Sequence, residues 1–242
     1  MKVQVFESHD EWMAGRRGKI TGSRLKDVVA KRAFTKEEVI AYLTAKGIEH
    51  NPKAKKEELE MLLTAADIAA LTVKAEKKIG FYELIAERLG IPSDDESAMD
   101  RGHRLEPQAI EEFEKATNTV VDRSLVIWSR EDNESIAVSP DGIVSPTEAV
   151  EVKCLSSANH IKAVLTKQIP DEYEFQKLQY FIVNDKLKKL YFVFYDPRLL
   201  AKPFFVIEVN RSEVQADVDK YLAYQKAMVA EVEAIVNELS GF

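Results

Sequence analysis

Cysteine is almost absent from this chain, since Cys154 is the only one in 242 residues. This scarcity excludes an internal disulfide, a zinc site built from several cysteines and a cysteine-ligated iron–sulfur cluster. Long apolar runs are missing as well, and residues 1–4 lack the apolar core of a signal peptide. We therefore expect a cytoplasmic protein with no membrane partner.

Positive charge is also scarce. The chain has 34 Lys and Arg against 41 Asp and Glu, a formal net charge of −7. This balance argues against non-specific binding to nucleic acid, because contacts to phosphate need basic groups. Three short basic clusters nevertheless occur at residues 16–19, 53–56 and 186–189. An acidic surface with one basic groove would reconcile the two observations.

The most informative stretch is residues 139–154. An apolar run, 136–138, leads into a Pro-Asp-Gly turn, and a second β-branched run carries an acid and a lysine among valines. This pattern predicts a hairpin. Strand side chains alternate between faces, so Glu151 and Lys153 point the same way. If Asp141 closes the neighbouring strand, two carboxylates and one ammonium converge.

Two explanations fit this convergence. Carboxylates so close repel each other unless a divalent cation lies between them, and Mg²⁺ prefers oxygen ligands. An ammonium beside bound water could then stabilise hydroxide and charge on a phosphate. The alternative is a solvated strand face after a common turn. The complete pattern is proline-aspartate, a spacer and then apolar-Glu-apolar-Lys. It makes the cation site as well supported as the solvated strand face.

Two further segments contain candidate site residues. Around Glu106, a helical stripe is formed by Leu105, Ala109, Ile110 and Phe113, and Pro107 predicts a bend or a new first turn. Glu106 lies beside the stripe, so it is a candidate third acid, with a salt bridge to arginine as the alternative. In the helix predicted at 172–183, Gln176 and Tyr180 share a face suited to hold a water or a phosphate. Ordinary surface residues would look the same.

Near the N-terminus, residues 16–25 predict a turn followed by a helix capped by Ser23. Free amides, a serine hydroxyl and the nearby Arg16 would make an anion site, although a plain helix cap is the alternative.

Residues 34–66 differ in character from their surroundings. Thr35 opens a short helix through a capping box, Gly47 ends it, and an extended link at 48–52 leads to a second short helix. Leu59, Leu62 and Leu63 are its expected core side. The unit resembles the helix-extended-helix nucleic-acid-binding modules related to SAP domains, and a plain helical hairpin insertion is the alternative.

The remaining segments predict an α/β fold with a mixed sheet flanked by helices. Helices are expected at 69–89 and 212–239, and strands at 125–128, 190–195 and 204–209. The core side of the 172–183 helix is expected to contain Phe175, Leu178, Phe181 and Ile182.

Taken together, the chain resembles a PD-(D/E)XK nuclease of the lambda exonuclease, or YqaJ-type viral recombinase, family. The residues that carry the resemblance are Trp12 and residues 16–23; Arg101, Gly102, Glu106 and Phe113; residues 139–142 and 151–154; Gln176 and Tyr180; and residues 191–192 and 195–198. The resemblance covers residues 1–33 and 67–242 as a nuclease domain and leaves 34–66 as an insertion.

The resemblance implies an Mg²⁺-dependent 5′ to 3′ exonuclease, with Mn²⁺ as a substitute and two ions per site. It would act on ends of double-stranded DNA and leave 3′ overhangs for a phage single-strand annealing protein. Metal would be held by Asp141, Glu151, the Val152 carbonyl and Glu106, with Lys153 and Gln176 completing the catalytic set. Arg16, Ser23 and Tyr180 would contact DNA or its 5′-phosphate. A homotrimer in the cytoplasm of a bacterial host, encoded by a phage or prophage, is also implied.

One departure from the family pattern concerns the glutamines, which the family separates by one residue. Here Gln176 and Gln179 are separated by two, and Gln176 is our choice. Two other functions remain open at this level: a structure-specific endonuclease of the same superfamily, and a DNA-binding protein without catalysis.

Overall fold

The computed structural model describes residues 4, 6–21, 24–28, 34–74, 77–92 and 96–240, without the side chains of residues 25 and 72–74. The chain divides into two compact units, Met1–Ser93 and Asp94–Phe242, which are described separately. Within the described residues, no helix is long and apolar enough to cross a membrane.

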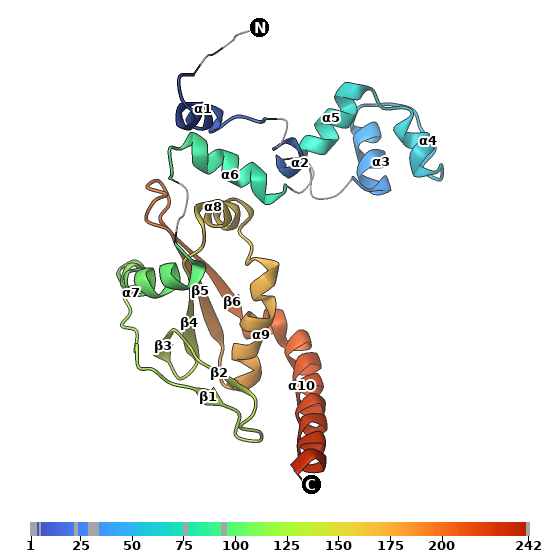
Figure 1. Ribbon diagram of the computed structural model, residues 1–242. Helices are drawn as coiled ribbons and strands as arrows, with labels where there is room; N and C mark the ends of the chain where they lie inside the picture. The colour runs from blue at the N-terminus through green and yellow to red at the C-terminus, as the bar shows by residue number, and fades with distance from the viewer. Residues whose placement is uncertain are drawn as a thin grey trace. The chain divides into compact units, whose positions relative to one another are not determined.

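The second unit is built on a four-stranded sheet in the order β3-β4-β5-β6 (Figure 1). Its strands are β3 (Gly142–Ser145), β4 (Glu148–Lys153), β5 (Lys189–Tyr195) and β6 (Phe204–Asn210). β4 and β5 are parallel and the other two pairs are antiparallel. The sheet is therefore mixed, as the sequence predicted.

Helices cover both faces of this sheet (Figure 1). Val150, Val152 and Val193 pack with the apolar stripe of α7 (Ala98–Thr117) on one face. Ala149 and Phe192 face the other side, with α9 (Glu174–Val183) and the first half of α10 (Arg211–Ser240). Because β4 and β5 are buried on both faces, they read as nearly continuous apolar runs, into which Glu151 and Lys153 insert charge. The predicted α/β fold, a mixed sheet flanked by helices, is thus confirmed.

The connection from β4 to β5 brings the site together. Parallel neighbours need a long crossover, which here consists of α8 (Ser157–Thr166), a 3₁₀ turn (Asp171–Tyr173) and α9. The crossover places α9 against the face of β4 that carries Glu151. The charged end of β4 therefore meets the first turns of α9.

Three predictions for this unit were wrong or incomplete. The 136–138 run does not pair with the strand of Glu151. It forms β2 (Ala137–Val138), which pairs with β1 (Trp128–Ser129) in a separate ribbon. The hairpin is β3–β4, with Asp141 just before it. The 125–128 strand is reduced to Trp128, because Leu125 and Ile127 are exposed.

Helices of this unit also depart from expectation at their surfaces. α7 continues through Pro107 and starts no new helix there. Phe175 is 64% exposed and so is not a core residue, whereas Leu178, Phe181 and Ile182 are buried as predicted. α10 extends far beyond the sheet, so its C-terminal apolar residues such as Val232 remain exposed.

The first unit is helical, with α1 (His9–Arg16), α2 (Leu25–Val28), α3 (Lys36–Ala45), α4 (Lys56–Glu60), α5 (Ala65–Lys74) and α6 (Ile79–Arg88). The single helix predicted over 69–89 is in fact two, because α5 ends at Lys74 and Lys78 is extended. Gly90 ends α6 in the left-handed conformation, as expected.

The predicted 34–66 insertion lies within this unit and has its own small core. Val39 and Leu43 of α3 are buried against Leu59 of α4. The capping box at Thr35 is present, and Gly47 closes α3 with a φ of 67°. Leu62 is 44% exposed, contrary to prediction, because α4 ends at Glu60.

Candidate active site

Strand β4 carries the two central charges. Glu151 is almost completely buried, and Lys153, two residues further on, forms an ion pair with its Oε1. Val150, Val152 and Cys154 point to the opposite face and pack with α7. The alternation expected from the sequence therefore holds, and it inserts a carboxylate and an ammonium beneath α9.

Asp141 joins the start of β3 to β4. Its Oδ2 accepts a hydrogen bond of 2.7 Å from the backbone N–H of Val152. The next residue must be small, because a Cβ at Gly142 would lie 2.4 Å from Cγ1 of Val121. The glycine of the Pro-Asp-Gly sequence thus leaves room for Val121 beside the start of β3.

Glu151 is held by three side-chain donors. Lys153 and Gln176 both donate to Oε1, the latter at 2.6 Å, and Tyr180 donates its hydroxyl to Oε2. Burial, and secondarily the charge of Asp141, still raises the pKa of Glu151 to about 7. Desolvation therefore outweighs the favourable contacts.

The helix α9 decides between the two glutamines. Gln176 faces Glu151, whereas Gln179 donates to the carbonyl of Ala137 and accepts from Gln225. Residues three apart lie near the same face of a helix, so it is the tertiary contacts, and not the spacing, that separate the two amides. Only Gln176 is placed at the site.

Tyr180 needs a correction. We expected it to contact DNA, but its side chain is fully buried, and its ring packs edge-on against Trp128. Its hydroxyl donates to Glu151. The fold therefore does not leave Tyr180 accessible to DNA. Its hydroxyl stabilises the buried carboxylate of Glu151 instead.

Glu106 reaches the same region from α7. It is half-buried, and burial followed by the nearby charge of Asp141 raises its pKa. Burial likewise raises the pKa of Asp141. The charge of Asp141 thus disfavours the ionised forms of Glu106 and Glu151, and an added positive charge would favour ionisation of all three carboxyl groups.

The predicted residues surround a cavity of about 520 Å³. It is lined by Glu106, Asp141, Glu151, Val152, Lys153 and Gln176, together with other residues of the second unit. Their oxygen donors and excess negative charge fit a hard divalent cation. Among the residues that the structure describes, however, no three metal-binding side chains lie close enough to hold an ion as they stand. A bound cation would have to displace donors that now occupy Glu151.

Sequence reasoning gave no role to three residues around this cavity. Arg101 is buried on α7, and its Nε donates to the Cys154 carbonyl at 2.8 Å, which ties α7 to the end of β4. Tyr173 lies against Lys153. The Cys154 thiol is buried, which raises its pKa to about 12 and keeps it protonated. For Arg101 and Cys154, the available signal was their inclusion in the motifs of the family resemblance.

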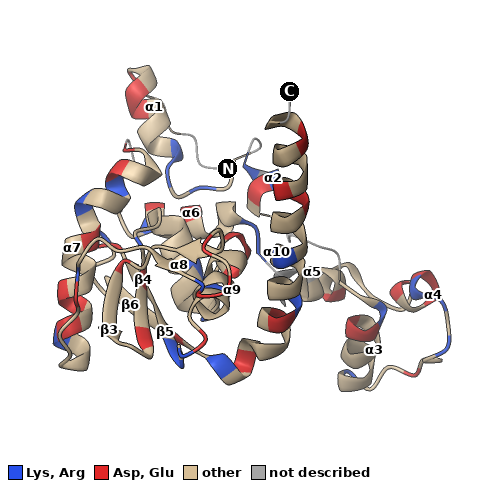
Figure 2. Ribbon diagram, turned by 90° about the horizontal axis from the view of Figure 1, so that it is seen from below, with Lys and Arg blue, Asp and Glu red and all other residues tan. Residues whose placement is uncertain are grey.

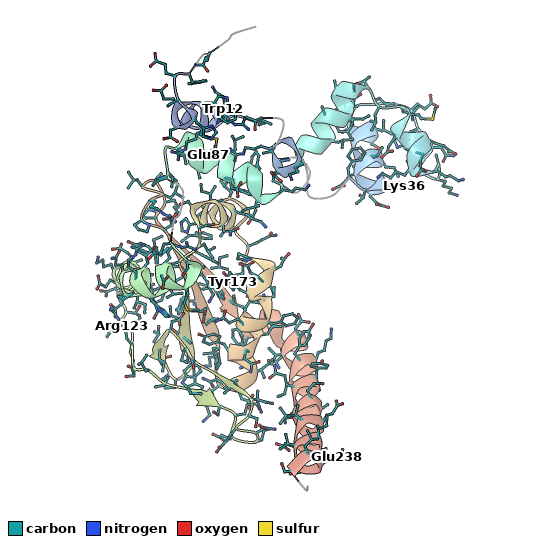
Figure 3. The ribbon with its side chains drawn as sticks, in the orientation of Figure 1. Trp12, Lys36, Glu87, Arg123, Tyr173 and Glu238 are labelled. Carbon is teal, nitrogen blue, oxygen red and sulfur yellow. The ribbon has the colours of Figure 1, made fainter. Side chains whose placement is uncertain are left out.

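The proposed 5′-phosphate residues belong to the first unit. The Arg16 guanidinium lies 4.4 Å from the Trp12 ring centroid and donates to Thr21 Oγ1 at 3.3 Å. Glu87 on α6 fixes the following loop by accepting from the Gly18 N–H at 2.6 Å; Trp12 and Glu87 are labelled in Figure 3. Ser23 lies outside the described residues.

The chain matches the YqaJ-like viral recombinase domain over residues 11–186. Among solved structures, it is similar to the alkaline exonuclease LHK-Exo from Laribacter hongkongensis, with 24% identity, 95% of this chain and 99% of that chain covered, and a TM-score of 0.48. LHK-Exo in complex with dAMP gives the same identity and coverage with a TM-score of 0.47. A phage related exonuclease from Haemophilus somnus 129PT shows 15% identity over 70% of this chain and 89% of that chain, with a TM-score of 0.37. No curated protein matches significantly.

Proposed function

Because the chain belongs to the YqaJ-like viral recombinase family, we propose that it is an Mg²⁺-dependent 5′ to 3′ exonuclease acting on ends of double-stranded DNA. The observation that carries the proposal is the single cavity lined by Glu106, Asp141, Glu151, Lys153 and Gln176. A nuclease needs acids to bind cations and a base or ammonium near the attacked phosphate. This cavity contains both kinds of group.

Four groups would hold metal: the carboxylates of Asp141, Glu151 and Glu106, and the Val152 carbonyl. Two Mg²⁺ ions, or Mn²⁺ in their place, would when bound supply positive charge for the attacking and leaving oxygens of a phosphodiester. Asp141 and the N–H of Val152 are already joined. That hydrogen bond fixes the spacing between the start of β3 and the end of β4.

Lys153 and Gln176 would act on the water and the phosphate. The ammonium can orient and activate a water molecule and offset the charge that develops on the phosphate. The amide of Gln176 can hold the same water or the adjacent phosphate oxygen. Both side chains line the cavity and donate to Glu151 Oε1.

Several finer features of the proposal come from the family resemblance. Arg16 and Ser23 would hold a 5′-phosphate, which would give the 5′ to 3′ polarity and leave 3′ overhangs. The overhang would pass to a single-strand annealing protein. We further propose a homotrimer that acts in the cytoplasm of a bacterial host.

Digestion of a linear duplex labelled at one 5′ or one 3′ end tests this function directly. With Mg²⁺ and a 5′-phosphate, a 5′ label should be released early as mononucleotide while a 3′ label stays on long products. Omission of Mg²⁺ should abolish release. Cleavage of a covalently closed circular duplex would instead indicate an endonuclease, and early release of the 3′ label would reverse the polarity.

We also propose that residues 34–66 form a separate DNA-binding module. Its core of Val39, Leu43 and Leu59 is local to the segment. The link from α3 to α4 contains one acid, Glu49, but ends in Lys53 and Lys55, and its part next to α4 appears blue in Figure 2. Lys53 and Lys55 are exposed there. Such a link could follow a DNA backbone.

The module is tested by the double variant Lys53→Glu, Lys55→Glu. We expect duplex affinity to fall about tenfold and the slope of log K against log salt to become shallower by up to about two, because two phosphate contacts are lost. Fluorescence anisotropy over a salt series measures both. Lys115→Glu, Lys220→Glu gives the same change in net charge on α7 and α10. Equal binding by the two double variants would refute the module's role.

A further inference from the structure

Lys153 has a second neighbour besides Glu151. Its side chain is 18% exposed at the end of β4, and its Nζ forms an ion pair with Glu151. The same Nζ lies over the ring of Tyr173, 4.9 Å from the centroid. The ammonium is therefore placed by a carboxylate and by an aromatic face.

The Tyr173 ring is itself fixed. Tyr173, labelled in Figure 3, ends the 3₁₀ turn that leads directly into α9. Its ring packs against Phe192 of β5 with centroids 6.1 Å apart, and it also lines the cavity. One side of the residue belongs to the core and another to the site. The ring thus offers Lys153 a surface whose position the fold determines.

We propose that Tyr173 is a positioning residue whose ring face holds the Lys153 ammonium at the wall of the cavity. The inference rests on the proposed function, because it takes Lys153 as the lysine of the reaction. A lysine ammonium sits on a flexible four-carbon stem, and the face of an aromatic ring attracts it electrostatically.

The ring matters because the Glu151 carboxylate does not bind Lys153 alone. Gln176 shares Oε1 of Glu151 with Lys153, and Tyr180 occupies the other oxygen. Any change in the charge or partners of this carboxylate would release an ammonium held by it alone. The ring provides a second support that does not depend on the carboxylate. Its face, not its hydroxyl, makes the contact, so phenylalanine should replace it.

Two substitutions test the proposal by steady-state kinetics on linear duplex DNA. Tyr173→Leu should lower kcat about tenfold with KM and DNA affinity unchanged, because the lysine is misplaced and the DNA surface is kept. Tyr173→Phe should stay within about threefold of wild type, because the ring remains. Tyr221→Leu is the matched control. The Lys220 Nζ lies 4.9 Å from the centroid of the Tyr221 ring, outside the cavity, so removal of the Tyr221 ring should leave kcat unchanged.

A second measurement does not require activity. Protons held over an aromatic face resonate upfield, so the ε-methylene signals of Lys153, identified by their loss in Lys153→Arg, should be shifted in wild type. The shift should persist in Tyr173→Phe and disappear in Tyr173→Leu.

Three results would overturn the proposal: wild-type kcat in Tyr173→Leu, an equal loss in Tyr173→Phe, or a rise in KM alone. Unchanged Lys153 signals in Tyr173→Leu would also overturn it. A wild-type protein that digests no DNA would refute the proposed function instead, and the resonance measurement would still decide whether the ring holds the lysine.

Discussion

Lys153→Ala should lower kcat for digestion of linear duplex DNA by about a thousandfold while DNA affinity changes less than about threefold. The Lys153 side chain is only 18% exposed and lines the cavity beside the acids, where a charge acts more strongly on developing negative charge than it does in water. Among the residues that the structure describes, its ammonium pairs with Glu151 and lies over the Tyr173 ring. Single-turnover digestion with saturating enzyme isolates the chemical step.

Lys177→Ala is the matched control for this variant. The Lys177 side chain is 14% exposed, close to the 18% of Lys153, and it also forms an ion pair, with Glu174. It does not line the catalytic cavity. We expect its kcat to equal that of wild type. Undiminished cleavage by Lys153→Ala in Mg²⁺ would remove Lys153 from the mechanism.

Asp141→Asn should abolish binding of Mg²⁺ and, with it, DNA hydrolysis. The substitution keeps an oxygen that can accept from the Val152 N–H, so the hydrogen bond that joins β3 to β4 survives. It removes one of the negative charges that hard cations require. We expect affinity for Mg²⁺ to fall at least about a hundredfold with little change in melting temperature. Isothermal titration calorimetry with Mg²⁺ and Mn²⁺ measures this directly.

Asp185→Asn controls for the loss of one carboxylate elsewhere. Asp185 is 69% exposed and pairs with Arg130, outside the catalytic cavity. Metal binding should be preserved in this variant. Equal titrations of Asp141→Asn and wild type would contradict the ligand assignment. A wild-type protein that binds neither ion would favour a DNA-binding protein without catalysis.

Local patterns in the sequence predicted much of the framework. The alternation at residues 150–154 placed Glu151 and Lys153 on one face because strand side chains alternate strictly. The Thr35 capping box and the Gly90 stop formed as predicted, because these signals act within a few residues. β5 and β6 matched their β-prone runs closely.

Strand partners and the break between two helices were not predictable in this way. The 136–138 run has the composition of a strand, but its pairing with Trp128 and Ser129 depends on residues outside the run. The 69–89 segment keeps helical spacing across a point where Lys78 is extended. Spacing alone does not show where tertiary packing interrupts a helix.

By itself, the sequence proposed which residues carry the chemistry and determined which of them share a strand face, because the first follows from residue type and the second from the two-residue repeat. Only the tertiary structure decided that Gln176, not Gln179, meets Glu151, that Tyr180 is buried beneath it, and that Tyr173 supports Lys153. These contacts join residues 20 to 29 positions apart in the chain. They exist because the crossover from β4 to β5 lays α9 against the strand, and no local pattern encodes where that helix comes to rest.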